Sequence, residues 1–164
     1  MDYLRQHFSD SLAGALVWLF PLTYALHIAE EYFADFPGYL RQTQGLELSE
    51  SRFVVLQSFG FLLMTVGVLL SRRLHFPNQM FAILATVLLG NSIIHVVRTF
   101  LLHTYEPGLI TCLLLWVPLG TYTLILQWGR FSGRRYFLCV TIGIAICIVV
   151  EILPLANDIR KYGT

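Results

Sequence analysis

Five long apolar runs alternate with short polar segments along the 164-residue chain. A membrane-spanning helix needs about 20 predominantly apolar residues, and each run has about that length or slightly more. The runs cover residues 11–33, 53–71, 77–102, 107–128 and 135–157. Because little is left between them, the pattern predicts an all-α fold, a polytopic bundle of five transmembrane helices with residues 1–164 as one domain.

The connection between the first two runs is the only long one. It begins with a turn signal at residues 35–38 and continues through a polar stretch to Glu50. The connection is long enough for a short helix. Aromatic residues that favour the headgroup region surround the turn, so we expect this helix to lie on the membrane surface. These anchors are Tyr32, Phe33, Phe36 and Tyr39.

Composition supports the membrane assignment and narrows the range of partners. Apolar residues make up 56% of the chain, charged residues 13%, and the mean hydropathy is +0.66, whereas soluble domains carry about 25% charge. A formal charge of +1 is too balanced for phosphate-backbone binding, so nucleic acid is not an expected partner. The expected partners are the membrane and a lipid or other apolar small molecule. Cys112, Cys139 and Cys147 lie inside apolar runs, which predicts small core residues.

Basic residues are unevenly shared between the two sides of the predicted bundle. The side of the N-terminus receives Arg5, Arg72, Arg73, Arg130, Arg134 and Arg135, and the other side receives Arg41, Arg52, Arg160 and Lys161. The positive-inside rule therefore predicts a cytoplasmic N-terminus and an extracytoplasmic C-terminus. No cleavage signal follows the first run, so we expect that helix to be retained.

Polar residues within the runs converge on one depth. The first, third and fifth runs cross in the same direction, and each carries polar groups in the part nearest its exit side. These groups are His27, Glu30 and Glu31, then Asn91, His95 and Arg98, then Glu151. An uncompensated charge at mid-bilayer costs about 2.5–3.5 kcal/mol on insertion scales, so these groups are expected to face the bundle interior.

The formal charges of this layer do not balance. Three glutamates face one arginine, which leaves two negative charges when the histidines are neutral. Adjacent carboxylates in a low dielectric do not both stay ionised unaided, so either protons or a divalent cation must neutralise them. Simpler interpretations remain open: His95 as an interhelical hydrogen-bonding residue, Glu30 and Glu31 in the headgroup region, and Arg98 in a structural ion pair.

Two motifs in this layer resemble those of a known family. The run His27-Ile28-Ala29-Glu30-Glu31, the spacing from Asn91 to His95 and the acidic residue Glu151 in a late helix resemble the HXXEE-motif family of small prokaryotic integral membrane proteins. The resemblance implies that His27, Glu30, Glu31, Asn91 and His95 form one site and that the membrane is a prokaryotic inner (plasma) membrane. It implies no particular reaction.

Spacing suggests a metal site. Residues four apart on a helix lie one above the other, so His27 and Glu31 are placed to chelate one ion, with His95 as a third ligand. Two histidines and a carboxylate with an open position are typical of catalytic zinc. Zinc is therefore favoured as the divalent metal, and iron is a further option, although the full di-iron bundle pattern is absent.

The remaining residues receive roles around this ion. Glu30, three residues after His27, is predicted to be the catalytic base, and Glu151 to be a fourth ligand or to orient a histidine. Asn91 is expected to donate a hydrogen bond to substrate or to a metal-bound carboxylate, and Arg98 to hold an anionic headgroup or an oxyanion.

Several functions fit these residues. The favoured one is a metal-dependent, hydrolase-like membrane enzyme acting on a lipid or isoprenoid near the extracytoplasmic leaflet. The alternatives are a metal-free acid–base isomerase or cyclase of an apolar substrate, a proton-coupled carrier and a purely structural subunit.

Overall fold

The computed structural model describes residues 16–74 and 76–162, with side chains described up to residue 152. Within these ranges the chain forms helices and no strand, which confirms the all-α prediction. The elements are α2 (Leu19–Phe33), α3 (Phe36–Gln44), α4 (Glu50–Arg73), α5 (Pro77–Leu102), α6 (Leu109–Thr111), the π-helical segment η1 (Cys112–Trp116), α7 (Val117–Trp128) and α8 (Gly133–Tyr162).

Four segments among the described residues are long and apolar enough to cross a membrane, rather than the five that the sequence predicts. They are Glu50–Arg73, Pro77–Leu102, Leu109–Trp128 and Gly133–Ile152. The missing span is the predicted helix 11–33, which begins outside the described residues. Its described part, α2, has 15 residues and is about 22 Å long, less than the hydrocarbon core of about 30 Å. The chain is a multi-pass membrane protein.

The predicted short helix between the first two apolar runs is present as α3. Asp35 has a φ of 52°, and its carboxylate accepts a hydrogen bond from the backbone N–H of Gly38 at 3.0 Å. Gly45, with a φ of 68°, ends the helix. The next helix, α4, begins at a serine cap, because the Ser49 hydroxyl accepts from the N–H of Arg52.

The helical segment from Leu109 to Trp128 changes its hydrogen-bond pattern at a proline. Pro118 has no N–H, and its ring clashes with the carbonyl four residues earlier, at Leu114. The π-helical segment η1 contains that residue, and a wider turn of this kind relieves such a clash. The side chains of Cys112 and Trp116, at the two ends of η1, are both fully buried.

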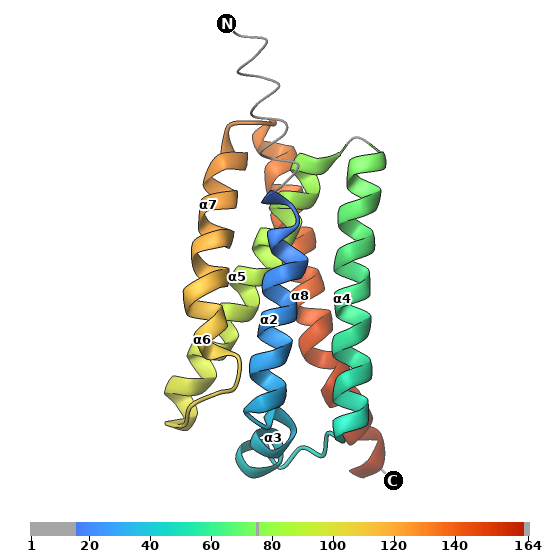
Figure 1. Cartoon of the computed structure of the whole chain (residues 1–164), viewed down its shortest axis with the longest axis vertical. Coiled ribbons are helices and arrows are strands. Elements are labelled where there is room, and N and C mark those ends of the chain that lie inside the picture. Colours follow the sequence, from blue (N-terminus) through green and yellow to red (C-terminus); the bar gives the residue numbers. More distant parts are fainter. Residues whose placement is uncertain (1–15, 75, 163–164) are drawn as a thin grey trace, which may run out of the picture.

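Helix α5 is the centre of the bundle and packs against α4, α7 and α8 (Figure 1). Glycines allow the closest approaches: a Cβ at Gly120 of α7 would lie 2.6 Å from Leu89, and one at Gly143 of α8 would lie 2.6 Å from Thr86. Small residues let membrane helices pack with their backbones close together.

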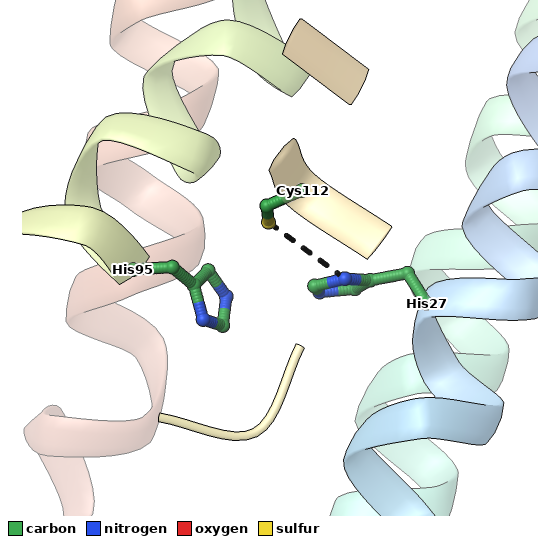
Figure 2. A group of neighbouring side chains, drawn as sticks. All are labelled: His27, His95 and Cys112. Carbon is green, nitrogen blue, oxygen red and sulfur yellow. Dashed lines mark hydrogen bonds between the residues drawn. The ribbon is translucent and has the colours of Figure 1, made fainter. Parts of the chain in front are cut away.

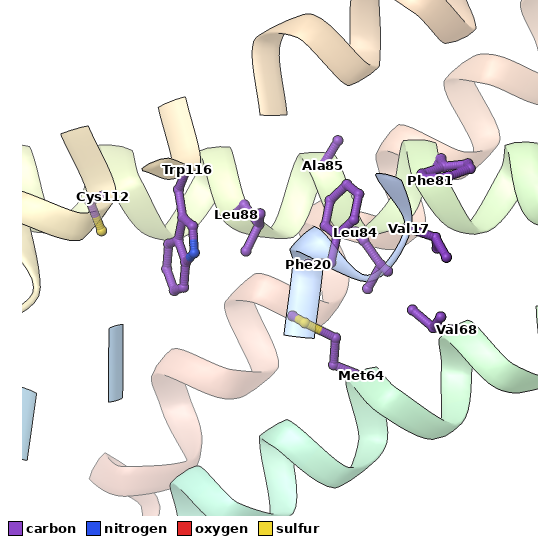
Figure 3. Close-up of a cluster of buried hydrophobic side chains, with 10 residues drawn as sticks. All are labelled: Val17, Phe20, Met64, Val68, Phe81, Leu84, Ala85, Leu88, Cys112 and Trp116. Atoms are coloured by element: carbon purple, nitrogen blue, oxygen red, sulfur yellow. The ribbon is translucent and has the colours of Figure 1, made fainter. Parts of the chain in front are cut away.

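A buried apolar cluster follows α5 from Phe81 to Leu88 and continues to Cys112 and Trp116 (Figure 3). The outer surface is also apolar, and large side chains on α4 such as Val55, Phe59 and Leu62 are more than half exposed. An outer face of this kind is expected where lipid chains cover the protein.

We predict that Gly143→Ala destabilises the bundle by about 1–3 kcal/mol, because the new methyl group would overlap Thr86 and the Ile83 carbonyl of α5. Gly133→Ala is the matched control on the same helix, where a Cβ has open space. Thermal unfolding in detergent measures both variants. Equal melting temperatures would contradict the close packing of α8 on α5.

Candidate functional site

Four ionisable side chains are buried together where α2 and α5 meet the segment that joins α5 to α6. His27 and Glu31 come from α2, His95 comes from α5, and Glu106 comes from the joining segment. Each is at most 3% exposed. Burial of so many ionisable groups requires that they satisfy one another or hold something between them.

Glu31 lies between the two histidines. Its Oε1 atom is 3.4 Å from Nε2 of His27, one helical turn earlier, and 3.8 Å from Nε2 of His95 on the neighbouring helix. The two imidazole rings meet edge to face with their centroids 5.1 Å apart. His27 and Glu31, four residues apart on α2, therefore lie on the same side of the helix and face His95, as the helical spacing predicts.

A hydrogen bond on the far side of His27 orients its imidazole ring. Nδ1 of His27 is 2.8 Å from the Thr111 hydroxyl, and that hydroxyl also lies 3.0 Å from the Gly108 carbonyl, to which it can donate. In the tautomer in which the hydroxyl donates to Gly108, Nδ1 of His27 is the donor toward Thr111, and Nε2 of the neutral ring directs a lone pair at Glu31.

A second hydrogen-bond chain orients the Glu31 carboxylate. Gln57 of α4 donates from its Nε2 to Oε2 of Glu31, and its own Oε1 accepts from the Tyr24 hydroxyl at 2.8 Å. These contacts occupy one carboxylate oxygen and leave Oε1 for the histidines. Two adjacent helices therefore hold Glu31 in a single orientation.

Glu31 can share a cation or a proton with either histidine. On the far side of His95, Nδ1 faces Glu106 Oε1 at 3.5 Å, which leaves Nε2 toward Glu31. Ligands at 2.0–2.2 Å from a tetrahedral zinc ion lie about 3.4 Å from one another. The separations of 3.4 Å from His27 and 3.8 Å from His95 to Glu31 are close to that spacing.

Cys112 joins the two histidines in a second potential donor set. One ligand atom from each of His27, His95 and Cys112 lies within 4.8 Å of the others, and all three residues are buried. Figure 2 shows Sγ of Cys112 directed at Nδ1 of His27, 3.9 Å away. The cluster could therefore hold a metal, although the cysteine approaches the His27 nitrogen that already bonds to Thr111.

Cys112 and Glu106 are the two residues of this cluster that sequence reasoning missed. Cys112 belongs to the core, as predicted, but it also lies at the depth of His27, since it comes five residues into its run from the exit side. Glu106 directly precedes a proline and a glycine, a pattern typical of a turn. Counting residues from the membrane surface places Cys112 at the level of His27. Nothing in the sequence indicates that the turn containing Glu106 folds inward.

Glu106 connects the histidines to an ion-pair network. Its Oε1 atom lies 3.3 Å from Arg98, and Oε2 has no hydrogen-bond partner among the described residues. Burial raises the pKa of the Glu106 carboxyl to about 7, and the charge of Arg98 opposes part of that rise. Arg98 also binds Glu151 on α8 at 2.5 Å.

These contacts change two predicted roles. The guanidinium of Arg98 already engages two carboxylates, so it is not a free site for an anionic headgroup. Glu151, predicted as a metal ligand or an orienter of a histidine, instead binds Arg98. The structural ion pair that the sequence left open as an alternative is the arrangement observed.

Glu30, the predicted catalytic base, makes its hydrogen bonds to Tyr105 and to the start of α6. One carboxylate oxygen accepts hydrogen bonds from the Tyr105 hydroxyl and the Ile110 N–H, and the other accepts from the Thr111 N–H. A carboxylate at a helix N-terminus is a favourable cap. Glu30 therefore anchors the start of α6, which in turn positions Thr111 beside His27.

Gly108 lets the joining segment close over the site. Its φ is 95°, and a Cβ there would lie 2.5 Å from Cε1 of His27 and 2.9 Å from Cε1 of His95. The segment passes both imidazoles in Figure 2. Only glycine combines this backbone conformation with such a close approach.

A cavity of about 450 Å³ extends from these residues along the bundle. Its polar end includes His27, Glu31, His95 and Asn91, and the rest is lined mainly by apolar side chains of α4, α5 and α8. Leu63 of α4 and Val150 of α8 line the cavity and are 56% and 50% exposed. The cavity therefore opens sideways between apolar residues of the outer surface.

We predict that Gly108→Ala lowers stability by about 1–3 kcal/mol more than Gly45→Ala does. Both glycines have positive φ values, but a Cβ at Gly45 meets nothing within 4 Å, so the control carries only the backbone cost. Thermal unfolding in detergent measures the difference. Indistinguishable variants would show that the segment does not pack on the imidazoles.

One family model matches the chain. Its description is a protein of unknown function with an HXXEE motif, and the match covers residues 18–123, well over half of the chain. The matched range includes the buried histidines, Glu31 and Glu106 and ends before Glu151. No curated protein and no solved structure matches. The chain belongs to the family of proteins with an HXXEE motif.

Proposed function

We propose that the protein is a metal-dependent membrane enzyme, hydrolase-like in its chemistry, that acts on a lipid or isoprenoid-type substrate. The observation that carries this proposal is the cavity, because it connects an apolar opening in the outer surface with the lone pairs of His27, Glu31 and His95. A substrate that partitions into the bilayer has a route to this site without passing through water.

We propose His27, Glu31 and His95 as the metal ligands and zinc as the favoured ion. Two imidazoles and one carboxylate keep a fourth position for water or substrate, and zinc there would act as a Lewis acid. The hydrogen bonds of His27 to Thr111 and of Glu31 to Gln57 support this set, because metal ligands are usually held by such outer contacts.

The predicted orientation completes the proposal. With a cytoplasmic N-terminus, and with the apolar run 11–33 as a fifth span, the site lies in the extracytoplasmic half of the membrane. Asn91 lines the cavity at this level and is proposed to contact the reacting group of the substrate.

A metal-free acid–base enzyme is the second candidate. The contacts of His27 and His95 with Glu31, and of His95 with Glu106, are imidazole–carboxylate pairs that protons can occupy instead of a cation. Such pairs support isomerisation or cyclisation of an apolar substrate by general acid–base chemistry. Once turnover is detected, full activity in the presence of a chelator would favour this candidate over the metal-dependent one.

We predict that the purified protein binds one zinc or cobalt ion per chain and that His27→Ala and His95→Ala abolish this binding. His103→Asn is the matched control, because His103 lies outside the cluster at the end of α5 with a φ of 49° that asparagine tolerates. Elemental analysis measures the metal content, and thermal unfolding verifies that each variant is folded. Folded histidine variants with undiminished metal content would contradict the proposed ligands.

We predict that substitutions of the two adjacent glutamates have different effects on metal binding. Glu31→Gln weakens metal binding by roughly tenfold or more, because it removes the carboxylate between the histidines. Glu30→Gln keeps the metal, because Glu30 caps α6 instead. Cobalt titration followed by absorbance measures both affinities. The reverse pattern, with metal loss only in Glu30→Gln, would mean that α2 is rotated relative to the present arrangement.

A further inference from the structure

The cavity has the form of a slot that follows one face of α5. Met80, Leu84, Leu88, Asn91 and His95 all line it, and their spacings of four, four, three and four place them on one stripe of the helix. Side chains of α4 and α8 line the two sides. Along α5 the lining is therefore apolar from Met80 to Leu88 and polar from Asn91 to Arg98. Phe36 and Leu40 of α3 also line the cavity.

The length of the apolar part matches a lipid chain. Asn91 is eleven positions after Met80, which corresponds to about 16 Å along the helix axis. Half of a hydrocarbon core of about 30 Å is about 15 Å. A chain that extends from the polar end to Met80 is thus about as long as the chains of one membrane leaflet.

The volume indicates one chain rather than two. Small-molecule pockets have volumes of about 300–1,000 Å³, and this slot, at about 450 Å³, lies in the lower part of that range. Its single stripe on α5 offers one track for an extended chain. Leu63 and Val150, which are exposed at its side, mark where such a chain can enter from the bilayer.

The polar end disfavours an anionic head group. Arg98 is paired with both Glu106 and Glu151, and Glu31 adds a further carboxylate, so the formal charge is minus two with neutral histidines. A phosphate would face this excess of negative charge, and a bound divalent cation would only balance it. Uncharged groups meet no such penalty.

Asn91 offers a partner of the kind that an uncharged head group needs. It lines the polar end of the slot, and in residues 16–152 its side-chain amide makes no hydrogen bond to another side chain. An amide supplies both a donor and an acceptor, which suits a hydroxyl or a carbonyl oxygen. The chemistry of this end is complementary to an alcohol, aldehyde, ester or amide.

We propose that the slot binds a single-chain, uncharged amphiphile, with its oxygen-bearing end at Asn91 and its chain along α5 toward Met80. This inference rests on the proposed function, since it names the substrate class of the same site. It disfavours isoprenyl diphosphates and two-chain phospholipids as substrates. Long-chain or isoprenoid alcohols and their neutral derivatives are the class that fits.

A photoreactive hexadecanol with a diazirine on its chain tests this proposal in nanodiscs. The protein is treated with chelator, so only binding is measured and the outcome does not depend on metal content or turnover. We expect cross-links, mapped by peptide mass spectrometry, near Met64, Met80 and Leu84. Unlabelled hexadecanol should suppress them at roughly one tenth of the concentration that hexadecyl phosphate needs, a difference of about 1.4 kcal/mol.

A variant of α4 tests the slot itself. A Cβ at Gly67 would already lie 3.4 Å from Cε of Met80, so Gly67→Leu is expected to fill the slot and remove these cross-links. Val66→Leu is the matched control, because Val66 is exposed on the outer face. Equal or better competition by hexadecyl phosphate would contradict the proposal that the site prefers an uncharged head group. Cross-links confined to outward residues such as Phe59 and Leu62, and unchanged in Gly67→Leu, would contradict the proposal that the chain binds in the slot.

Discussion

The arrangement depends on one buried contact, that of the Glu31 carboxylate with the Nε2 atoms of two histidines. In the tautomer in which Nδ1 of His27 donates to Thr111, this contact brings acceptor atoms together, which is unfavourable among buried groups. A cation or shared protons would relieve the conflict, and this is the physical basis of the proposed metal site.

The surrounding fold serves to hold that contact in place. Glu30 caps α6 and thereby fixes Thr111, while Gly108 brings the joining segment against both imidazoles. The wider turns before Pro118 place Cys112 and Trp116 on the inner side. Because Trp116 also belongs to the apolar core, packing and site geometry are coupled. A change in either should therefore disturb the other.

The helices and their common polar depth could be predicted from the sequence, because apolar run length and rise per residue are local properties. The pairing of His27 with Glu31 followed in the same way from helical spacing. The inward fold of Glu106 could not be predicted, since a glutamate before proline and glycine is usual in a solvated turn. The different directions of the Glu30 and Glu31 side chains could not be predicted either, because they depend on the contacts of Glu30 with α6.

X-ray absorption spectroscopy of the zinc-loaded protein tests the central claim most directly, because it reports the atoms around the ion. The proposed ligand set predicts two imidazoles and one carboxylate oxygen at about 2.0–2.2 Å. It predicts no sulfur at that ion, because Thr111 occupies the His27 nitrogen nearest Cys112. A zinc shell without imidazole, or one with sulfur at about 2.3 Å in place of the carboxylate, would contradict the assignment of Glu31 as the bridging ligand.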